Sequence, residues 1–249
     1  MKKISISLTE VSAKAERSER QERAIILGVN QYASIDNPIT VKAGNHSVSN
    51  VVEAKKMEGC NKFGCEQYTD VVLITSDGAE INVSCKGTTS PSIAGGGLLG
   101  LKALFPYVVP KFLEAAERWY LQNKYKEGDL IPDIYGKMND DDKMLAIVGT
   151  EEIGGPIDYM YVGPMDIEGR YSDGLLEYPG DLMPAAEYAD THEVFFRLRK
   201  RRNDQPFMPG QKDKSGYPLI LGRSPSKGDT GRRIVLVNKL PKTRNIVEF

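Results

Sequence analysis

Two short β-rich segments joined by a turn constrain the fold of this chain more than any other feature of its 249 residues. The first, residues 70–75 (DVVLIT), is apolar after its aspartate, which is typical of a strand covered on both faces. Asp77-Gly78 is a strong hairpin-turn signal. In the second segment, residues 80–86 (EINVSCK), apolar side chains alternate with Glu, Asn, Ser and Lys. The sequence therefore predicts an antiparallel hairpin with one polar side.

We expect the candidate catalytic side chains to lie together at the open end of this hairpin. Asp70 opens the first segment and Lys86 closes the second, so pairing across the turn places Asp70 close to Ser84 and Lys86. Carboxylate oxygens are the protein ligands that Mg²⁺ takes together with substrate phosphate, and an ammonium group stabilises developing negative charge. This combination suits metal-assisted hydrolysis of phosphodiesters.

Residues 48–58 (VSNVVEAKKME) are predicted as a helix, because valines recur along one side and Gly59 follows as a C-cap glycine. Glu53 lies near the edge of the apolar side of that helix. We therefore expect Glu53 to supply a second carboxylate beside Asp70.

The hairpin resembles the core of the PD-(D/E)XK, or restriction-endonuclease-like, nuclease superfamily over roughly residues 48–125. The signature of that superfamily is an aspartate on one strand and acid-x-lysine on the next. Here Ser84 stands in the place of the second acid, and Thr69 precedes the aspartate where the signature has proline.

The resemblance implies an α/β (α+β) fold in which a mixed β-sheet is flanked by helices. It also implies Mg²⁺- or Mn²⁺-dependent cleavage of DNA. Asp70 and Glu53 would hold the metal, Lys86 would be the catalytic lysine, and Ser84 would complete the polar side of the site.

A glycine-rich loop follows the hairpin and leads into a helix predicted over about residues 98–123, with interruptions at two prolines. Gly95, Gly96 and Gly97 would let a DNA backbone approach the helix N-terminus closely. A flexible linker is the alternative. The match of GGGLLG to a dinucleotide-binding motif lacks the strand that should directly precede it.

Charge divides the chain into three parts. Residues 126–190 carry 16 acidic and 4 basic side chains, and residues 191–249 carry 5 acidic and 14 basic ones. We expect a nuclease-like core over residues 1–125, an acidic insertion or subdomain over 126–190, and a basic β-rich segment completing the core domain. Within the acidic part, MLAIVG and IDYMYVG are predicted strands.

Strands are also expected in HEVFFRLRKRR, YPLILGR and GRRIVLVNK. Arginines on one side of such strands suit contacts with the DNA backbone, which give affinity without sequence readout. A solvated edge strand protected by charge is the alternative. The predicted DNA-binding arginines are Arg197, Arg199, Arg201, Arg232 and Arg233.

The N-terminal part is expected to hold a strand around Ile4, Ile6 and Leu8 and a helix over about residues 12–30. Residues 39–44 are expected to form a short extended piece or a loop. The first residues lack the apolar core of a signal peptide, and no apolar run reaches bilayer length. We therefore expect a cytoplasmic protein without a membrane partner.

Three cysteines, an odd number, fit a reducing compartment. A zinc site built from Cys60, Cys65, Cys85 and His46 is an alternative to free thiols, although the cysteine spacing is not the usual one.

The function expected from these features is a metal-dependent DNA endonuclease of a phage or restriction type. It would act in the host cytoplasm if phage-encoded, as a homodimer or in a larger phage assembly. Two alternatives stay open: a non-catalytic DNA-binding or virion structural protein on the same scaffold, and a module that docks another protein.

Overall fold

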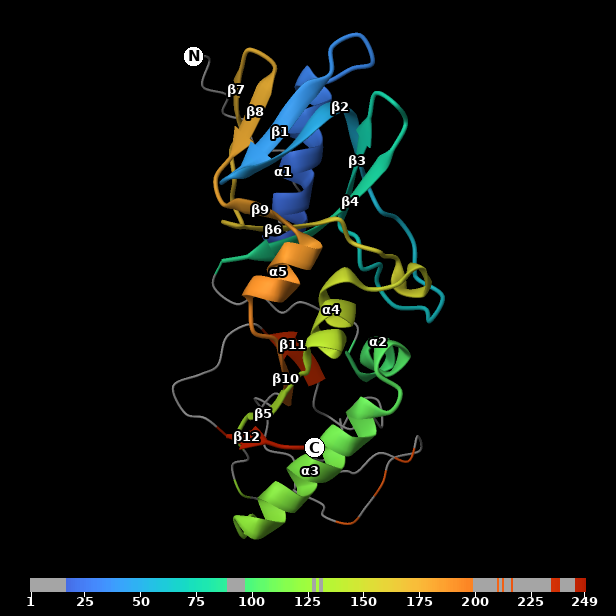
Figure 1. The fold of residues 1–249 in the computed structure, drawn as a ribbon, viewed down its shortest axis with the longest axis vertical. Coiled ribbons are helices and arrows are strands. Elements are labelled where there is room, and N and C mark those ends of the chain that lie inside the picture. The colour runs from blue at the N-terminus through green and yellow to red at the C-terminus, as the bar shows by residue number, and fades with distance from the viewer. Residues whose placement is uncertain are drawn as a thin grey trace. The chain divides into compact units, whose positions relative to one another are not determined.

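A computed structural model describes residues 17–88, 97–126, 129, 132–198, 210, 212, 216, 234–237 and 245–249. Over these ranges the protein is mixed α/β, with two mixed sheets, five α-helices and one 3₁₀ turn, Glu151–Ile153 (Figure 1). The helices are α1 Arg17–Tyr32, α2 Gly97–Leu104, α3 Val108–Gln122, α4 Asp140–Val148 and α5 Ala185–Thr191. The strands are β1 Ile39–Ala43, β2 His46–Lys56, β3 Val71–Thr75, β4 Glu80–Gly87, β5 Ile134–Lys137, β6 Tyr159–Gly163, β7 Arg170–Ser172, β8 Leu175–Tyr178, β9 Asp181–Pro184, β10 Phe195–Leu198, β11 Ile234–Val237 and β12 Ile246–Val247.

The chain divides into two compact units that are each discontinuous in sequence. The first comprises residues 1–91 and 147–192, and the second comprises residues 92–146 and 193–249. This division differs from the three consecutive segments expected from charge. The acidic stretch is shared between the units, because β6, β8 and β9 pair into the sheet that the N-terminal strands begin.

The first unit contains an eight-stranded sheet of order β7-β8-β1-β2-β3-β4-β6-β9. Strands β1 to β4 form an antiparallel meander, and β6 then pairs in parallel with β4. The predicted hairpin is confirmed as β3 and β4, with Val71 opposite Val83. Both faces of β3 are covered, since Val71, Val72 and Leu73 are buried.

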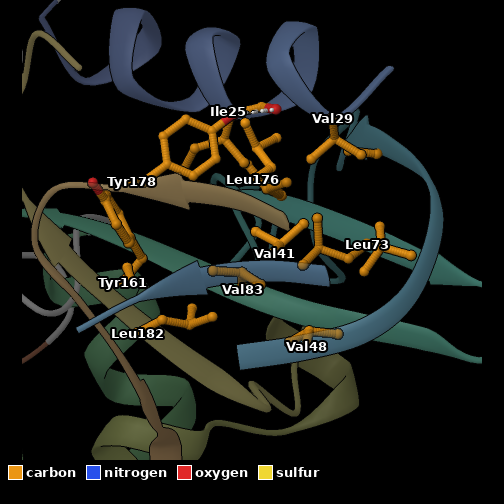
Figure 2. Packing of buried hydrophobic residues seen from close by; sticks show 14 of the residues in the cluster. Ile25, Val29, Val41, Val48, Leu73, Val83, Tyr161, Leu176, Tyr178 and Leu182 are labelled. Atoms are coloured by element: carbon orange, nitrogen blue, oxygen red, sulfur yellow. Dashed lines mark hydrogen bonds between the residues drawn. The ribbon is translucent and has the colours of Figure 1, made fainter. Parts of the chain in front are cut away.

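Helix α1 packs against one face of this sheet (Figure 1). Ile25 and Val29 point from the helix toward the strands, where they join buried side chains that include Leu176 (Figure 2). The hydroxyl of Tyr178 on β8 lies 3.2 Å from the carbonyl oxygen of Ile25. Gly28 makes this contact possible, because a Cβ there would lie 2.1 Å from the Tyr178 Oη.

The prediction of a helix over residues 48–58 is wrong, because His46–Lys56 form strand β2. Its buried positions, Val48, Val51 and Ala54, are three residues apart, which imitates a helical period. The spacing arises because Asn50 has a positive φ of 59° and the pairing with β3 shifts register between Val51 and Glu53. Such irregularities reset the two-residue alternation of a strand.

The second unit is built on a four-stranded sheet of order β11-β10-β5-β12. Helix α2 contacts β11, and α3 contacts β12. Phe196 on β10 packs between Phe105 and Phe112, with ring centroids 5.3 and 5.6 Å away. The predicted interruption of the long helix is confirmed at Pro106, between α2 and α3. Pro110 lies in the first turn of α3 and does not interrupt it, since a proline there removes no intrahelical hydrogen bond. The strands predicted within HEVFFRLRKRR and GRRIVLVNK are confirmed as β10 and β11.

Residues 144–149, predicted as a strand, instead lie mostly in α4. Asn139 caps this helix, since its Oδ1 accepts the N–H of Asp142 at 2.7 Å. Three aspartates in the first turn also suit the positive end of a helix. The strand predicted at residues 157–163 is confirmed as β6, and the extended piece at 39–44 as β1.

Some predicted elements cannot be compared with the structure. The strand around Ile4 and the segment YPLILGR lie outside the described residues, and the predicted N-terminal helix is described from Arg17 onward. None of the described helices is long and apolar enough to cross a membrane.

Candidate active site

The open end of the β3–β4 hairpin brings Asp70 beside the end of β4. The backbone N–H of Asp70 donates to the carbonyl of Val83 at 3.0 Å, which ties the residue before β3 to β4. Because side chains alternate along each strand, Ser84 and Lys86 lie on the same side of β4. The predicted meeting of Asp70, Ser84 and Lys86 is confirmed.

One carboxylate oxygen of Asp70 accepts three hydrogen bonds from β4. Its Oδ2 receives the Ser84 hydroxyl at 3.0 Å, the Cys85 backbone N–H at 2.6 Å and the Lys86 ammonium at 3.1 Å. The other oxygen, Oδ1, has no hydrogen-bond partner among the residues that the structure describes. The carboxylate is thus held firmly through one oxygen.

The ion pair between Asp70 and Lys86 is mostly withdrawn from water, with side-chain exposures of 19% and 15%. A pair in this position costs desolvation energy that a fully exposed pair does not. Placing charge at such a site is typical of a functional group as well as of a structural ion pair.

A second ion pair lies beside the first. Glu22 on α1 contacts Lys56, the last residue of β2, with 3.2 Å between Oε2 and Nζ. Lys56 stands opposite Val71 in the pairing of β2 with β3, so it belongs to the same end of the sheet as Asp70. The Glu22 side chain is 11% exposed, and that of Lys56 is 49% exposed.

The two pairs influence each other electrostatically. Burial raises the pKa of Glu22, and the negative charge of Asp70 raises it further, while Lys56 and Lys86 act in the opposite direction. Partial burial lowers the pKa of Lys56, but the Glu22 carboxylate outweighs this and the net pKa is raised. One charge cluster is therefore formed by Glu22 on α1, Lys56 on β2, Asp70 immediately before β3 and Lys86 on β4.

Two neighbouring groups are held neutral. Burial, followed by the charge of Asp70, raises the pKa of Tyr68 and of the Cys85 thiol. A thiol that is buried and not ionised is a poor nucleophile. Cys85 therefore contributes its backbone N–H to the site, and its side chain packs in the core between α1 and the sheet.

The donor set at this sheet end suits Mg²⁺ or Mn²⁺. These ions take one or two protein carboxylates and complete their coordination with water and substrate phosphate. Asp70 Oδ1 and the Glu22 carboxylate are two such groups, and their mutual repulsion is what a divalent cation would relieve. No group of three or more His, Cys, Asp or Glu side chains in the described ranges is arranged to hold a metal.

Glu53 occupies a different place from the one predicted. It lies on β2, not on a helix, and is exposed. It stands opposite Ile74, three residue pairs from the Lys56–Val71 pair, which corresponds to about 10 Å along the strand. The structure therefore does not bring Glu53 to the Asp70–Lys86 pair.

The predicted phosphate-binding glycines lie largely outside the described residues, since only Gly97, the first residue of α2, is included. Arg199, Arg201, Arg232 and Arg233 also lie outside them. Arg197 is described, and its guanidinium donates to Asp133 through Nε at 3.1 Å and Nη2 at 2.7 Å. That guanidinium is therefore engaged within the second unit rather than presented on an exposed basic strand.

The zinc alternative finds no support in the placement of its four side chains. Cys60 is exposed, Cys65 is half-buried and Cys85 is buried. His46 contacts carboxylates instead, with Glu187 at 3.2 Å and Asp181 at 3.9 Å.

Sequence reasoning missed Glu22 and Lys56. Glu22 is followed at helical spacing by Ile25 and Val29, so a carboxylate on the apolar stripe of α1 was the available signal. Lys56 was missed because its strand was predicted as a helix. As a strand, β2 would have ended beside Asp70.

Comparisons with protein-family models, with curated proteins and with solved structures find no match for this chain.

Proposed function

We propose that the protein is a metal-dependent nuclease that hydrolyses phosphodiester bonds in DNA. The observation that carries this proposal is the Asp70–Lys86 pair at the open end of the β3–β4 hairpin, with 3.1 Å between the charged atoms. The Glu22–Lys56 pair lies at the same end of the sheet, because Lys56 stands opposite Val71. The substrate class rests on the resemblance of this hairpin to PD-(D/E)XK nucleases, and the second acid comes from α1 rather than from Glu53.

In the proposed reaction, the carboxylates of Asp70 and Glu22 would hold Mg²⁺ or Mn²⁺. When bound, the ion supplies Lewis acidity toward a phosphodiester oxygen and lowers the pKa of a coordinated water. The Lys86 ammonium is placed to stabilise negative charge that develops on the phosphate, and the Ser84 hydroxyl and Cys85 N–H keep Asp70 in position.

A second candidate function is a DNA-binding or virion structural protein without catalytic activity. It is favoured by Ser84, which stands in place of an acid, and by the three donors that already occupy Asp70 Oδ2. In that case the pair would serve to fix the hairpin end, and breaking it would affect stability alone.

The test is incubation of the purified protein with plasmid DNA and Mg²⁺ or Mn²⁺, beside the variants Asp70→Asn and Lys86→Met. Lys55→Met is the matched control. Lys55 is the residue immediately before Lys56 on β2, it is exposed, and it forms an ion pair with Glu80 on β4. We expect metal-dependent nicking by the parent and by Lys55→Met, with a loss of at least about 100-fold in the two site variants.

Retardation of DNA without cutting would favour the second candidate. Equal nicking by the parent and both site variants would contradict the proposed site. Circular dichroism of every variant establishes that a loss of cutting does not come from unfolding.

A further inference from the structure

Helix α1 is tied to the sheet through polar contacts at separate points along its length. Near its start, the Gln21 amide Nε2 donates to the carbonyls of Gly163 at 3.1 Å and Pro164 at 2.9 Å. Near its end, Asn30 exchanges hydrogen bonds with the backbone of Ala54, at 2.7 and 2.8 Å. The first tie lies at the sheet end where the charge cluster is, and the second lies nearer the other end of α1.

Gln21 is placed to fix the backbone on which Lys86 stands. The carbonyl of Lys86 lies 3.5 Å from its Nε2, and Lys86 and Gly87 pair in parallel with Val162 and Gly163. The single amide therefore spans the carboxyl ends of β4 and β6. It is 1% exposed, so water does not compete for these contacts.

Gln21 immediately precedes Glu22 on α1, so the same helical turn carries the tie to β4 and the carboxylate beside Asp70. We infer that Gln21 is a positioning residue, which holds the Glu22 turn of α1 against the ends of β4 and β6 and so fixes the distance between Glu22 and the Asp70–Lys86 pair. This inference rests on the proposed nuclease function for its catalytic meaning, but the tie itself is a matter of geometry.

The geometry has its own reporter, independent of activity. The backbone N–H of Cys85 donates to Asp70 Oδ2 at 2.6 Å, so its hydrogen exchange reports whether Asp70 stays on β4. If the tie through Gln21 holds the end of β4 in place, removing it should loosen this contact before the sheet as a whole unfolds.

The experiment compares Gln21→Met, which keeps the side-chain length and removes the donor, with Asn30→Leu as the matched control. Both variants lose amide contacts between α1 and a strand backbone. Exchange of the Cys85 amide is measured at single-residue resolution and corrected for the stability of each variant, beside the cleavage of plasmid DNA. We expect exchange at least about tenfold faster in Gln21→Met and a change below about threefold in Asn30→Leu.

The cleavage measurements should follow the same division. Since a small displacement of catalytic groups lowers the rate steeply, we expect Gln21→Met to lose at least about tenfold in kcat with little change in KM. Should Gln21→Met not fold, Gln21→Ala replaces it, because alanine also lacks the amide donor, and the same acceleration of Cys85 exchange is expected.

Unchanged Cys85 exchange in the Gln21 variant, or equal acceleration in both variants, would overturn the inference. A parent protein that cuts no DNA would refute the proposed function instead. The exchange comparison would then still decide whether Gln21 holds the charge cluster together.

Discussion

Glu22 is the residue of the site whose charge is least well accommodated. Its carboxylate is largely buried and lies close enough to Asp70 for that charge to raise its pKa, and its pairing with Lys56 compensates only in part. A fold keeps such a residue at a cost in stability, which is common where the charge serves a function.

The pH dependence of stability follows from the raised pKa of Glu22. Below the ordinary value of 4.5, both folded and unfolded chains carry the proton. As the pH rises, the unfolded chain loses its proton first, so the contribution of Glu22 to stability falls until the folded group has also ionised. Glu22→Gln removes this loss, and we expect its stability relative to the parent to improve between about pH 4 and pH 7.

Urea denaturation of the parent and of Glu22→Gln across this pH range measures the effect. Glu80→Gln serves as the control, because Glu80 is 52% exposed and its pair with Lys55 has no comparable burial. A Glu22→Gln variant that becomes less stable relative to the parent as the pH rises would show that the ion pair with Lys56 dominates instead.

At the scale of elements, the contact between α1 and β8 limits which residue can stand at position 28. Alanine would usually stabilise a helix relative to glycine by about 1 kcal/mol. Here its Cβ would lie 2.1 Å from the Tyr178 Oη and 3.3 Å from Cζ, so the hydroxyl is the principal obstacle. We expect Gly28→Ala to cost about 1–3 kcal/mol through overpacking.

A double-mutant cycle with Tyr178→Phe isolates that obstacle. Tyr178→Phe alone should cost about 0.5–1.5 kcal/mol, because it removes the hydrogen bond from the hydroxyl to the α1 backbone. The double variant should lose less than the sum of the single losses, since phenylalanine has no hydroxyl to clash with the new methyl group. Strictly additive losses in the free energy of unfolding would contradict this packing.

The elements predicted correctly from sequence are those whose signals are local. The β3–β4 hairpin follows from a run of apolar residues, an Asp-Gly turn and clean alternation, and its register then brings Asp70 to Ser84 and Lys86. The prediction for β2 was wrong because the irregular pairing of this strand with its neighbours spaces its buried residues by three, as in a helix. Predicting the contribution of Glu22 to the site would have required knowing where α1 packs on the sheet, and no local sequence pattern gives this.

At the scale of the whole molecule, the chain leaves the first unit and returns to it. Residues 92–146 separate the β1–β4 meander from β6, the strand that pairs with β4. Since charge composition follows the sequence and not the pairing of distant strands, it could not indicate this division. Each unit also has its own set of buried side chains, with Val29 and Leu176 in the first and Phe112 and Phe196 in the second.

Because each unit has its own core, we expect a core mutation in one unit to change the unfolding transition of that unit and not of the other. The single tryptophan, Trp119, lies on α3 in the second unit, so its fluorescence reports that unit alone. We expect Gly28→Ala to shift the urea transition followed by circular dichroism, to which both units contribute, while the Trp119 transition stays in place. Phe196→Leu, which weakens the aromatic core of the second unit, should lower the Trp119 midpoint. If either substitution moved both transitions equally, the two units would instead unfold as one cooperative structure.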